Sequence, residues 1–361
     1  MLKARRSAPI PLVFYPDYRA MNPYQTQLYA ALRPFAAAKS GSAADALQLL
    51  DNNAERPVLF HLHWEHQVLI DARQTVESFL DGLAAFRDAG GKIIWTLHNL
   101  SPHEKYPEQD LADLIGGLTG LADVIHLHSL EAFVAARQDR TLPATKIRVI
   151  PHGNYRGSYP VVSRDSARAA LGIENAGMVL LLPGRIAQYK NPQGVVAAFQ
   201  RIAGPDDRLI VAGHFVDGLQ LDTNSDIRIL LKEGFASAED LAAFHAAADL
   251  IVLPYVRSLT SGSAILAATL GRGVLGPSCP GLRDVVSSGA TGVLYDPAGE
   301  DALADAMARA MSEGPDTWRA RGRAAAKAVE ARDADIISGA WRDLITGIIC
   351  GAADQRTGAT E

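Results

Sequence analysis

Short apolar runs alternate with Ala-rich, helix-like segments along nearly the whole chain of 361 residues. Alternation of this kind favours right-handed βαβ units, which build a parallel sheet with helices on both of its faces. The order is interrupted over residues 154–177, which carry no strong strand, and then restarts with the run "MVLLLPGR". The pattern therefore predicts an α/β protein made of two doubly wound domains.

We expect three segments from this order: an N-terminal domain over 1–160, a C-terminal domain over 161–330, and a C-terminal helix with a disordered tail over 331–361. The chain is long for one hydrophobic core and suits two domains of roughly 150 residues each. Open α/β sheets bind ligands outside the carboxyl ends of their strands. Two such domains therefore predict a ligand-binding cleft between the two sets of strand ends.

Composition narrows the class of protein. The formal net charge is -5, whereas a general nucleic-acid binder needs a basic surface to neutralise phosphates. The two cysteines, Cys279 and Cys350, lack the spacing of a zinc site or a disulfide framework, which favours a reducing compartment. The N-terminus resembles neither a signal peptide nor a membrane span, and apolar runs such as "MVLLLP" are only strand-length. We expect a cytoplasmic protein, peripheral at most on the inner face of the cytoplasmic membrane.

One segment bears on such a membrane contact. Residues 24–39, "YQTQLYAALRPFAAAK", have the composition of an amphipathic helix, with Arg33 and Lys39 beside aromatic and leucine side chains. A helix of this kind could lie in a membrane interface, but packing on the protein core explains the same pattern.

The stretch "IIWTLHNLSPHE" at residues 93–104 reads as a strand that is followed directly by polar residues. Its apolar and β-branched beginning is typical of a parallel strand that is buried on both faces. It then stops in a group of polar side chains that includes His98, Asn99 and Glu104. A core strand can end in this way if its carboxyl end faces a cleft.

Neighbouring strand ends repeat the arrangement. The runs "HLHWEH", "VIHLHS" and "IPHGN" supply His61, His63, Trp64, Glu65, His126, His128 and His152. In the first run, the alternation of a strand puts both leading histidines on one face. Each histidine alone is more often a structural group. Burial and neighbouring charges can, however, bring the pKa values of several histidines near neutrality, where imidazoles serve as acids or bases.

A metal site is the alternative for these histidines. Histidines at i and i+2 can share an ion, but no third ligand follows at a recognisable spacing. No D-x-D pair suggests a nucleotide held by magnesium. We therefore expect no metal and no cofactor, and interpret the histidines as a polar wall of the cleft.

The second half holds two candidate phosphate-binding segments. "PGRIAQYKNP" places Arg185 and Lys190 on a loop that enters a helix, where fixed cations and backbone amides together suit a diphosphate. The segment 253–277 turns through Ser261, Gly262 and Ser263 into another helix, and small residues there let amides approach a phosphate. Solvated surface cations and a plain serine N-cap are the simpler explanations of each segment taken alone.

The motifs together resemble a known family. "NPYQTQLYAAL", "HLHW", "TLHNLSPHE", "PHGNY", "GRIAQYKN" and "LPYVRSLTSGSAILAATLGRGV" occur in this order over residues 22–277. The set resembles GT-B glycosyltransferases, and among them the bacterial exopolysaccharide mannosyltransferases of the xanthan-assembly type. The resemblance implies the GT-B fold, in which two Rossmann-like doubly wound domains face a central cleft.

The resemblance also implies an activity. It implies transfer of mannose from GDP-mannose, with inversion and without a metal, to a polyprenyl-diphosphate-linked oligosaccharide at the inner membrane face. It implies that Arg185 and Lys190 hold the donor diphosphate, which residues 261–263 cradle. In the cleft and on the acceptor side, we expect Asn22, Tyr24, His61, His63, Trp64, Asn99, His128 and His152.

Inversion requires a base that removes the proton of the acceptor hydroxyl on the face opposite the leaving group. Glu104 and Glu65 are the candidates for this base, and His98 is expected to contact the transferred sugar. The chain departs from many retaining GT-B enzymes, which carry two glutamates seven residues apart near the second phosphate motif. Ser258 and Leu266 stand at about those positions, so ribose contacts of that type are in question.

Two alternatives stay open. The donor could be a UDP-sugar, such as UDP-glucose or UDP-glucuronate, although a carboxylate-bearing sugar calls for an extra cation that the sequence does not place. The chain could also be a non-catalytic sugar-nucleotide-binding assembly protein that kept the fold and lost the chemistry. Intact Arg185, Lys190 and cleft carboxylates count against the second alternative.

Overall fold

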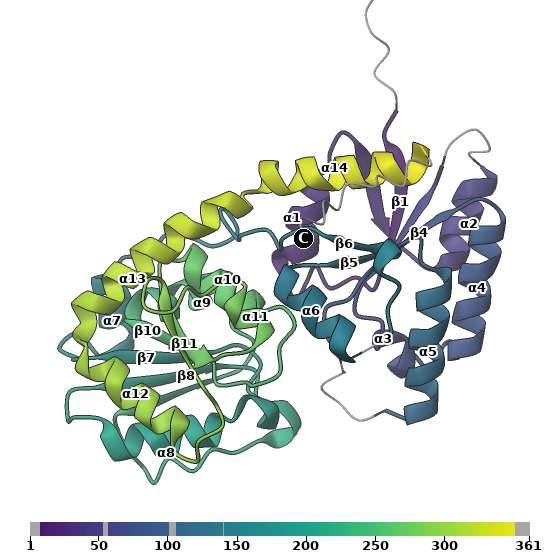
Figure 1. Cartoon of the computed structure of the whole chain (residues 1–361). Helices are drawn as coiled ribbons and strands as arrows, with labels where there is room; N and C mark the ends of the chain where they lie inside the picture. The colour runs from purple at the N-terminus through teal and green to yellow at the C-terminus, as the bar shows by residue number, and fades with distance from the viewer. Residues whose placement is uncertain (1–7, 53–56, 101–105, 140, 351–361) are drawn as a thin grey trace, which may run out of the picture. The chain divides into compact units, whose positions relative to one another are not determined.

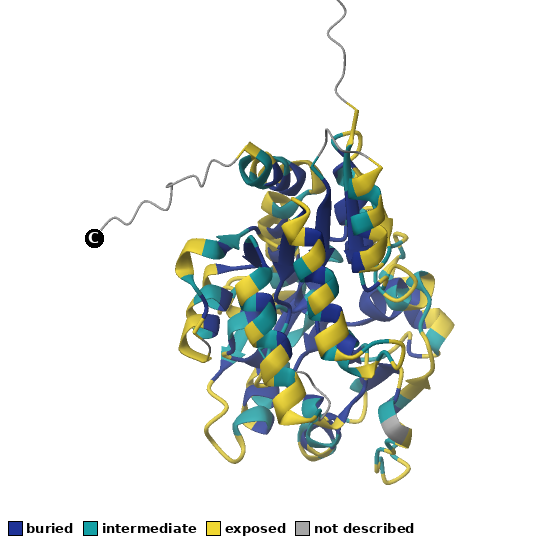
Figure 2. Ribbon diagram, turned by 90° about the vertical axis from the view of Figure 1, so that its right-hand side faces the viewer, coloured by how far each residue is buried: buried dark blue, intermediate teal, exposed yellow. Residues whose placement is uncertain are grey.

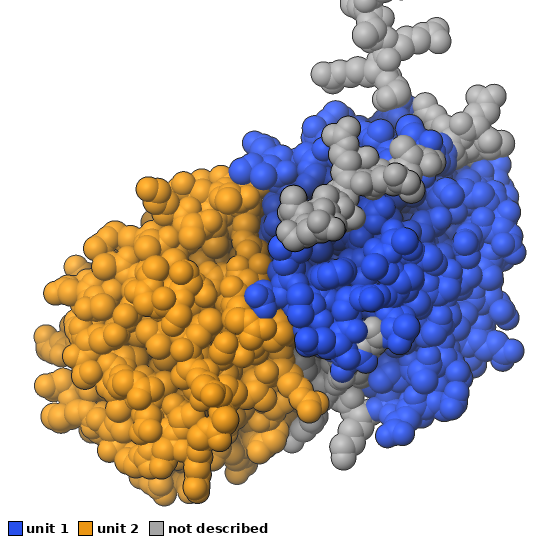
Figure 3. Space-filling view, in the orientation of Figure 1, with its two compact units in different colours: residues 1–153, 334–361 blue, residues 154–333 orange. Residues whose placement is uncertain are grey.

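The computed structural model describes residues 8–52, 57–100, 106–139 and 141–350. They form two compact units (Figure 3). Unit 1 contains Met1–Gly153 together with Ala334–Glu361, and unit 2 contains Asn154–Asp333. The segment 351–361, predicted as a disordered tail, lies outside the described residues.

Unit 1 is built on a parallel sheet of six strands in the order β2-β1-β3-β4-β5-β6 (Figure 1). The strands are β1 (Ile10–Tyr15), β2 (Ala36–Ser40), β3 (Leu59–Leu62), β4 (Lys92–Thr96), β5 (Val124–Leu127) and β6 (Ile147–Val149). The helices are α1 (Pro23–Ala31), α2 (Ala43–Asp51), α3 (Gln67–Ile70), α4 (Val76–Asp88), α5 (Glu108–Leu121), α6 (Leu130–Asp139) and α14 (Ala334–Cys350). The central strands β3, β4 and β5 are almost entirely buried, as Figure 2 shows for the interior of the sheet.

The C-terminal helix α14 belongs to unit 1 although it follows unit 2 in sequence. It packs beside α1, and Figure 1 shows the two helices close together. Trp341 of α14 is 2% exposed, and its ring centroid lies 5.1 Å from that of His61 and 4.6 Å from that of His126. The last helix therefore completes the core of unit 1.

The helix predicted over residues 24–39 is wrong in its second half. Helix α1 ends at Ala31, and Ala36–Ser40 forms the edge strand β2, paired in parallel with β1. Proline at position 34 lacks an amide hydrogen and disfavours the helical conformation of the residue before it. Alanine has a low strand propensity, so an alanine-rich segment rarely indicates a strand. Its pairing with the edge of β1 therefore stabilises this strand.

Unit 2 repeats the plan with a parallel sheet in the order β12-β11-β10-β7-β8-β9. The strands are β7 (Val179–Pro183), β8 (Arg208–Gly213), β9 (Ile229–Glu233), β10 (Leu250–Val252), β11 (Gly273–Pro277) and β12 (Gly292–Tyr295). The helices are α7 (Arg164–Leu171), α8 (Pro192–Ile202), α9 (Ala238–Ala247), α10 (Gly262–Thr269), α11 (Pro280–Arg283), α12 (Ala302–Ser312) and α13 (Gly314–Ala328). Along β7, Leu180 and Leu182 join one core cluster while Val179 and Leu181 join another, so both faces of the sheet are covered.

These two sheets confirm the predicted fold class of two Rossmann-like, doubly wound α/β domains, while the cleft between them stays a prediction. Within the described ranges, no helix has the length and hydropathy required to cross a membrane.

Candidate functional site

The loop after β7 is shaped by two glycines. Gly184 has φ +95° and Gly213, at the end of β8, has φ +141°, both in the region that side chains rarely adopt. A β-carbon on Gly213 would lie 1.8 Å from the carbonyl oxygen of Gly184. The carboxyl ends of β7 and β8 therefore meet backbone to backbone, and no larger residue fits between them.

Lys190 and Ser263 approach this loop from two different segments. The position of a β-carbon on Gly184 would lie 3.6 Å from Lys190 Nζ and 4.0 Å from Ser263 Oγ. Arg185 follows directly and acts electrostatically on Lys190. The structure thus brings together Arg185, Lys190 and the start of α10, which are far apart in sequence.

The start of α10 is capped and held in place. Ser261 Oγ accepts a hydrogen bond from the Ala264 amide at 3.1 Å, and the Tyr255 hydroxyl lies 2.5 Å from the same oxygen. Space at Gly262 is tight, because a β-carbon there would lie 3.1 Å from the hydroxyl of the neighbouring Tyr155. The amides and positive dipole end of this helix favour an anion.

Lys190 carries its charge in an unusual environment. It is 7% exposed, and burial, followed by repulsion from Arg185, lowers the pKa of its ammonium group to about 8. The Tyr255 ring centroid lies 5.6 Å from Nζ in a cation–π contact. No described carboxylate forms an ion pair with Lys190. A buried, unpaired cation next to a helix N-terminus is suited to binding an anionic group.

In unit 1, the strand ends gather the predicted histidines into one buried cluster. The members that the structure buries are His61, His63, His98, His126, His128 and His152. Burial lowers the pKa of four of them, His61, His63, His98 and His128, well below the usual value and that of His126 to about 4. These five imidazoles are therefore neutral at pH 7.

Aromatic rings enclose the cluster. Trp64, whose φ of 36° is unusual for a residue with a side chain, stacks on His98 with ring centroids 4.1 Å apart and planes 10° apart. The Tyr24 ring presents its edge to His98 and His128 at 5.4 and 5.6 Å. Asn22 caps α1 and so positions Tyr24, whose amide donates to Asn22 Oδ1 at 2.8 Å.

Of the two glutamates predicted as the base, the structure describes one. Glu104 lies outside the described residues. Glu65 is 3% exposed, and its Oε2 accepts a hydrogen bond from Trp95 Nε1 at 3.2 Å. Asn99 is partly buried just beyond β4. A glutamate that is buried and bonded to an indole has little access to a substrate hydroxyl.

Several groups of the site were missed by the sequence analysis. Tyr29 of α1 and Thr96 of β4 form hydrogen bonds to the histidines, and both ring nitrogens of the 1% exposed His128 lack a partner among the described residues. Within the same residues, no three histidine, cysteine or acidic side chains are arranged to hold a metal ion. Only the clustering of histidines at strand ends pointed to this region beforehand.

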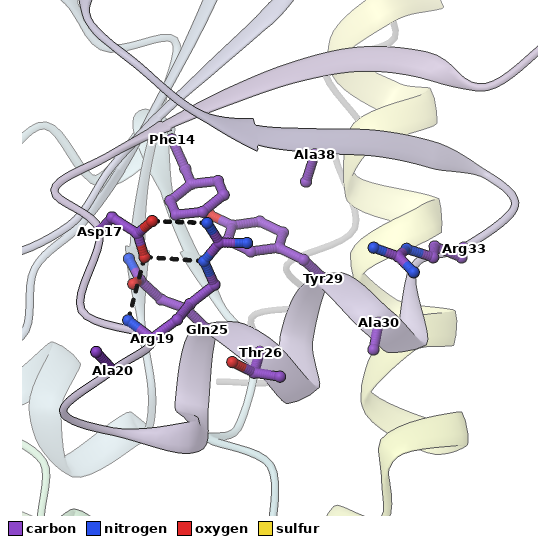
Figure 4. A pocket seen from close by; sticks show the side chains of 10 residues that line it. All are labelled: Phe14, Asp17, Arg19, Ala20, Gln25, Thr26, Tyr29, Ala30, Arg33 and Ala38. Carbon is purple, nitrogen blue, oxygen red and sulfur yellow. Dashed lines mark hydrogen bonds and ion pairs between the residues drawn. The ribbon is translucent and has the colours of Figure 1, made fainter.

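A pocket of about 650 Å³ opens beside the cluster (Figure 4). It lies against α1, β1 and β2, and the ring of Tyr29 forms part of its wall. Arg19 lies over the Phe14 ring, 5.1 Å from its centroid, and donates to Asp17. Arg33 stands at the other end of α1 in the same view. The pocket thus combines aromatic rings with a few charged and polar groups, as small-molecule sites commonly do.

Comparison with known proteins defines the class. Residues 177–313, which include the Lys190 loop and the start of α10, match the family of glycosyl transferases group 1. Among solved structures, Anabaena Alr3699/HepE in complex with UDP and glucose superposes with a TM-score of 0.71 at 16% identity, covering 94% of this chain and 100% of that one. A glycosyltransferase from Rickettsia africae gives a TM-score of 0.71 at 12% identity, covering 95% and 99%. The chain therefore has the GT-B fold, and its residues 177–313 are similar to the glycosyl transferases of group 1.

Two proteins of similar sequence have names that specify their substrates. GDP-mannose:glycolipid 4-beta-D-mannosyltransferase of Xanthomonas campestris pv. campestris is 27% identical over 319 residues, which are 81% of this chain and 82% of that protein. D-inositol 3-phosphate glycosyltransferase of Mycobacterium sp. (strain KMS) is 30% identical over 184 residues, 48% of this chain and 42% of the relative. The resemblance to the xanthan-assembly mannosyltransferases, inferred from the motifs, is confirmed.

Proposed function

We propose that this glycosyltransferase moves mannose from GDP-mannose, with inversion, to a polyprenyl-diphosphate-linked oligosaccharide during bacterial exopolysaccharide biosynthesis. The observation that carries the proposal is the buried, unpaired Lys190 beside Arg185 and the start of α10. A nucleotide diphosphate leaves with negative charge, and fixed cations and amides stabilise that charge as it develops. Ser261, Gly262 and Ser263 would contact the same diphosphate through the helix N-terminus.

The sugar and the acceptor are inferred from similarity. The Xanthomonas relative acts with GDP-mannose on a glycolipid, and its similarity extends over most of this chain. Unit 1 is the side that would bind the acceptor, with Asn22, Tyr24, Trp64 and Asn99 near the histidine cluster. A lipid-linked acceptor would bring the protein to the inner face of the cytoplasmic membrane as a peripheral protein.

A UDP-sugar donor is the second candidate. Anabaena Alr3699/HepE has this fold and was solved with UDP and glucose, and also with UDP-glucose. A diphosphate site alone does not distinguish the two nucleotides, because Arg185 and Lys190 contact the part that they share.

Thermal unfolding with a panel of sugar nucleotides tests the donor. A ligand that binds only the folded state stabilises it by about 2.7 kcal/mol at one hundred times its Kd. We expect GDP-mannose to raise Tm and the UDP and dTDP sugars to raise it little. A larger shift with UDP-glucose or UDP-glucuronate would establish the second candidate, and no shift with any sugar nucleotide would refute the donor site.

Enzymatic turnover tests the chemistry with the same panel. We expect the full-length protein to release GDP from GDP-mannose slowly in water, and NMR of the sugar product to show the β-anomer first. The Lys190→Met variant should lose both binding and release. Donor binding without any release or transfer would favour the non-catalytic alternative.

A further inference from the structure

A continuous chain of hydrogen bonds crosses the carboxyl ends of the sheet in unit 1. We name it the histidine chain, and its members in order are the Ile150 carbonyl, His126, Thr96, His61, Tyr29, His63 and His98. The side chains come from β3, β4 and β5, the residues just after them, and α1. Because its imidazoles are buried and neutral, each offers one hydrogen-bond donor and one acceptor.

The histidine chain has a fixed direction because it ends on a carbonyl. The Ile150 oxygen can only accept, so His126 Nε2, at 2.9 Å, carries a hydrogen. His126 Nδ1 is then bare and accepts from the Thr96 hydroxyl at 2.9 Å. The single hydroxyl hydrogen of Thr96 is used in that bond. Its oxygen must therefore accept from His61 Nε2 at 2.7 Å.

The same reasoning continues to the other end. His61 Nδ1 is bare and accepts from the Tyr29 hydroxyl at 3.0 Å, and Tyr29 Oη accepts from His63 Nε2 at 2.8 Å. His63 Nδ1 is then bare and accepts from His98 Nε2 at 3.1 Å. It follows that His98 carries its hydrogen on Nε2 and an unshared electron pair on Nδ1.

His98 is the open end of the histidine chain. It is 6% exposed, whereas the other three histidines of the chain are at most 1% exposed. No hydrogen bond among the described residues reaches its Nδ1. Stacking on Trp64 and the edge of Tyr24 fix the plane of its ring. The bare nitrogen therefore has a fixed orientation at the end of the cluster with some access to solvent.

We propose that the histidine chain holds His98 in its Nε2–H form, so that Nδ1 takes the proton of the acceptor hydroxyl during sugar transfer. The inference rests on the proposed function and gives to His98 the role that the sequence suggested for a glutamate. The acceptor oxygen bonds to the anomeric carbon while the bond from that carbon to the diphosphate oxygen breaks. The electron pair of the broken bond leaves with the nucleotide, and the imidazolium later gives its proton to solvent.

The surroundings of His98 determine how its charge responds to pH. Among the described residues, the titratable groups that face it are Tyr24, His61, His63, His66, His126, His128 and His152. None of these groups is an anion at neutral pH, so none stabilises the imidazolium in the free protein. The acid limb of the rate profile should therefore lie below pH 6.5.

The protonated nitrogen of His98 in the wild-type protein is the direct test. Long-range proton–nitrogen NMR of the full-length protein labelled with ¹⁵N-histidine distinguishes the two neutral forms, and His98→Gln assigns the signals. We expect His98 in the Nε2–H form at pH 7.5. A His98 that carries its hydrogen on Nδ1 would overturn the proposal, whatever the behaviour of any variant.

Thr96→Val tests the positioning role of the chain, since valine has the shape of threonine but neither donates nor accepts. We expect a mixture of the two His98 forms and at least a tenfold lower rate of GDP release from GDP-mannose, with unchanged GDP affinity. Thr96→Ser should restore both. Thr119→Val is the matched control, because within the described part of the chain the Thr119 hydroxyl bonds only to the Ile115 carbonyl in α5. An unchanged rate and a pure Nε2–H form in Thr96→Val would refute this role.

His98→Gln tests the proton transfer itself. General base catalysis typically contributes 10²–10⁴-fold, so we expect a loss of that size in GDP release and loss of the acid limb. Calorimetric affinity for GDP should be retained. A near-native rate with intact GDP binding would refute the role of His98 and leave the proposed function standing, whereas a wild-type protein that binds no sugar nucleotide would refute the proposed function.

Discussion

At the scale of single residues, Lys190 makes donor binding depend on pH. Its ammonium group has a pKa of about 8 because the side chain is buried and Arg185 is near. A bound diphosphate favours the charged form, so binding above pH 8 takes up a proton. We predict full GDP affinity below about pH 8 and a fall of up to tenfold per pH unit above it, measured by titration calorimetry between pH 7 and 9.5.

Lys190→Arg provides the control for that pH dependence. A guanidinium stays charged through this range, so the variant should bind GDP with an affinity that is flat to pH 9.5. The same decline in the arginine variant as in the wild type would show that another group titrates.

How far individual residues could be predicted depends on where their partners lie. The histidines that follow β3, β4 and β5 were foreseeable, because the carboxyl ends of neighbouring parallel strands meet at one edge of a sheet. Tyr29 and Trp341 were not, because they come from α1 and α14, and nothing local in the sequence shows which strand a helix covers. Glu65 was chosen for its chemistry, while its burial against Trp95 depends on packing.

At the scale of elements, a buried ion pair fixes α7 to the amino ends of β7 and β10. Asp249, fully buried, accepts from Arg168 and Arg164 at 2.8 Å each and from the Val179 amide at 2.9 Å. Removing one partner of such a pair leaves a buried charge uncompensated. We predict that Arg168→Met lowers the free energy of unfolding by about 3 kcal/mol, as measured by urea denaturation.

Arg164→Met is the matched comparison, because the Arg164 side chain is 29% exposed and Arg168 only 4%. It should cost less than about 1 kcal/mol. Equal losses in the two variants would contradict the assignment of the buried pair. Both variants should keep their GDP affinity, since the pair lies at the strand ends opposite Lys190.

The helices and strands were predicted best where the local sequence pattern and the local residue propensity indicate the same element. Most strands of both sheets follow apolar runs visible in the sequence, and α8 and α10 begin where the loops enter them. The strand Ala36–Ser40 was missed because its pairing with β1 compensates for a poor local propensity. The C-terminal helix was predicted as a helix, but its return to unit 1 depends on contacts far apart in sequence.

At the scale of the whole molecule, the two units should differ in their resistance to acid. Five buried histidines of unit 1 have lowered pKa values, against His245 alone among the described residues of unit 2. The unfolded chain binds protons on these groups below about pH 6.5, whereas the folded state keeps them neutral. Stability is therefore complete above pH 6.5 and falls with decreasing pH, by about 1.4 kcal/mol per pH unit for each histidine.

Hydrogen exchange followed by mass spectrometry measures this difference peptide by peptide. After correction for the intrinsic exchange rate, we expect peptides of β3, β4 and β5 to lose protection between pH 6.5 and 5, while peptides of β7 and β8 keep theirs. Earlier loss in unit 2 would contradict the prediction.

The central claim is that Arg185 and Lys190 form a diphosphate site in unit 2, and titration calorimetry with GDP tests it most directly. We predict that Arg185→Ala weakens GDP binding by about 1.5–3 kcal/mol, the scale of a hydrogen bond to a charged group. The control Arg201→Ala removes an exposed arginine of α8 that pairs with Asp301, and should bind GDP like the wild type. Unchanged affinity in Arg185→Ala, or an equal loss in Arg201→Ala, would contradict the account.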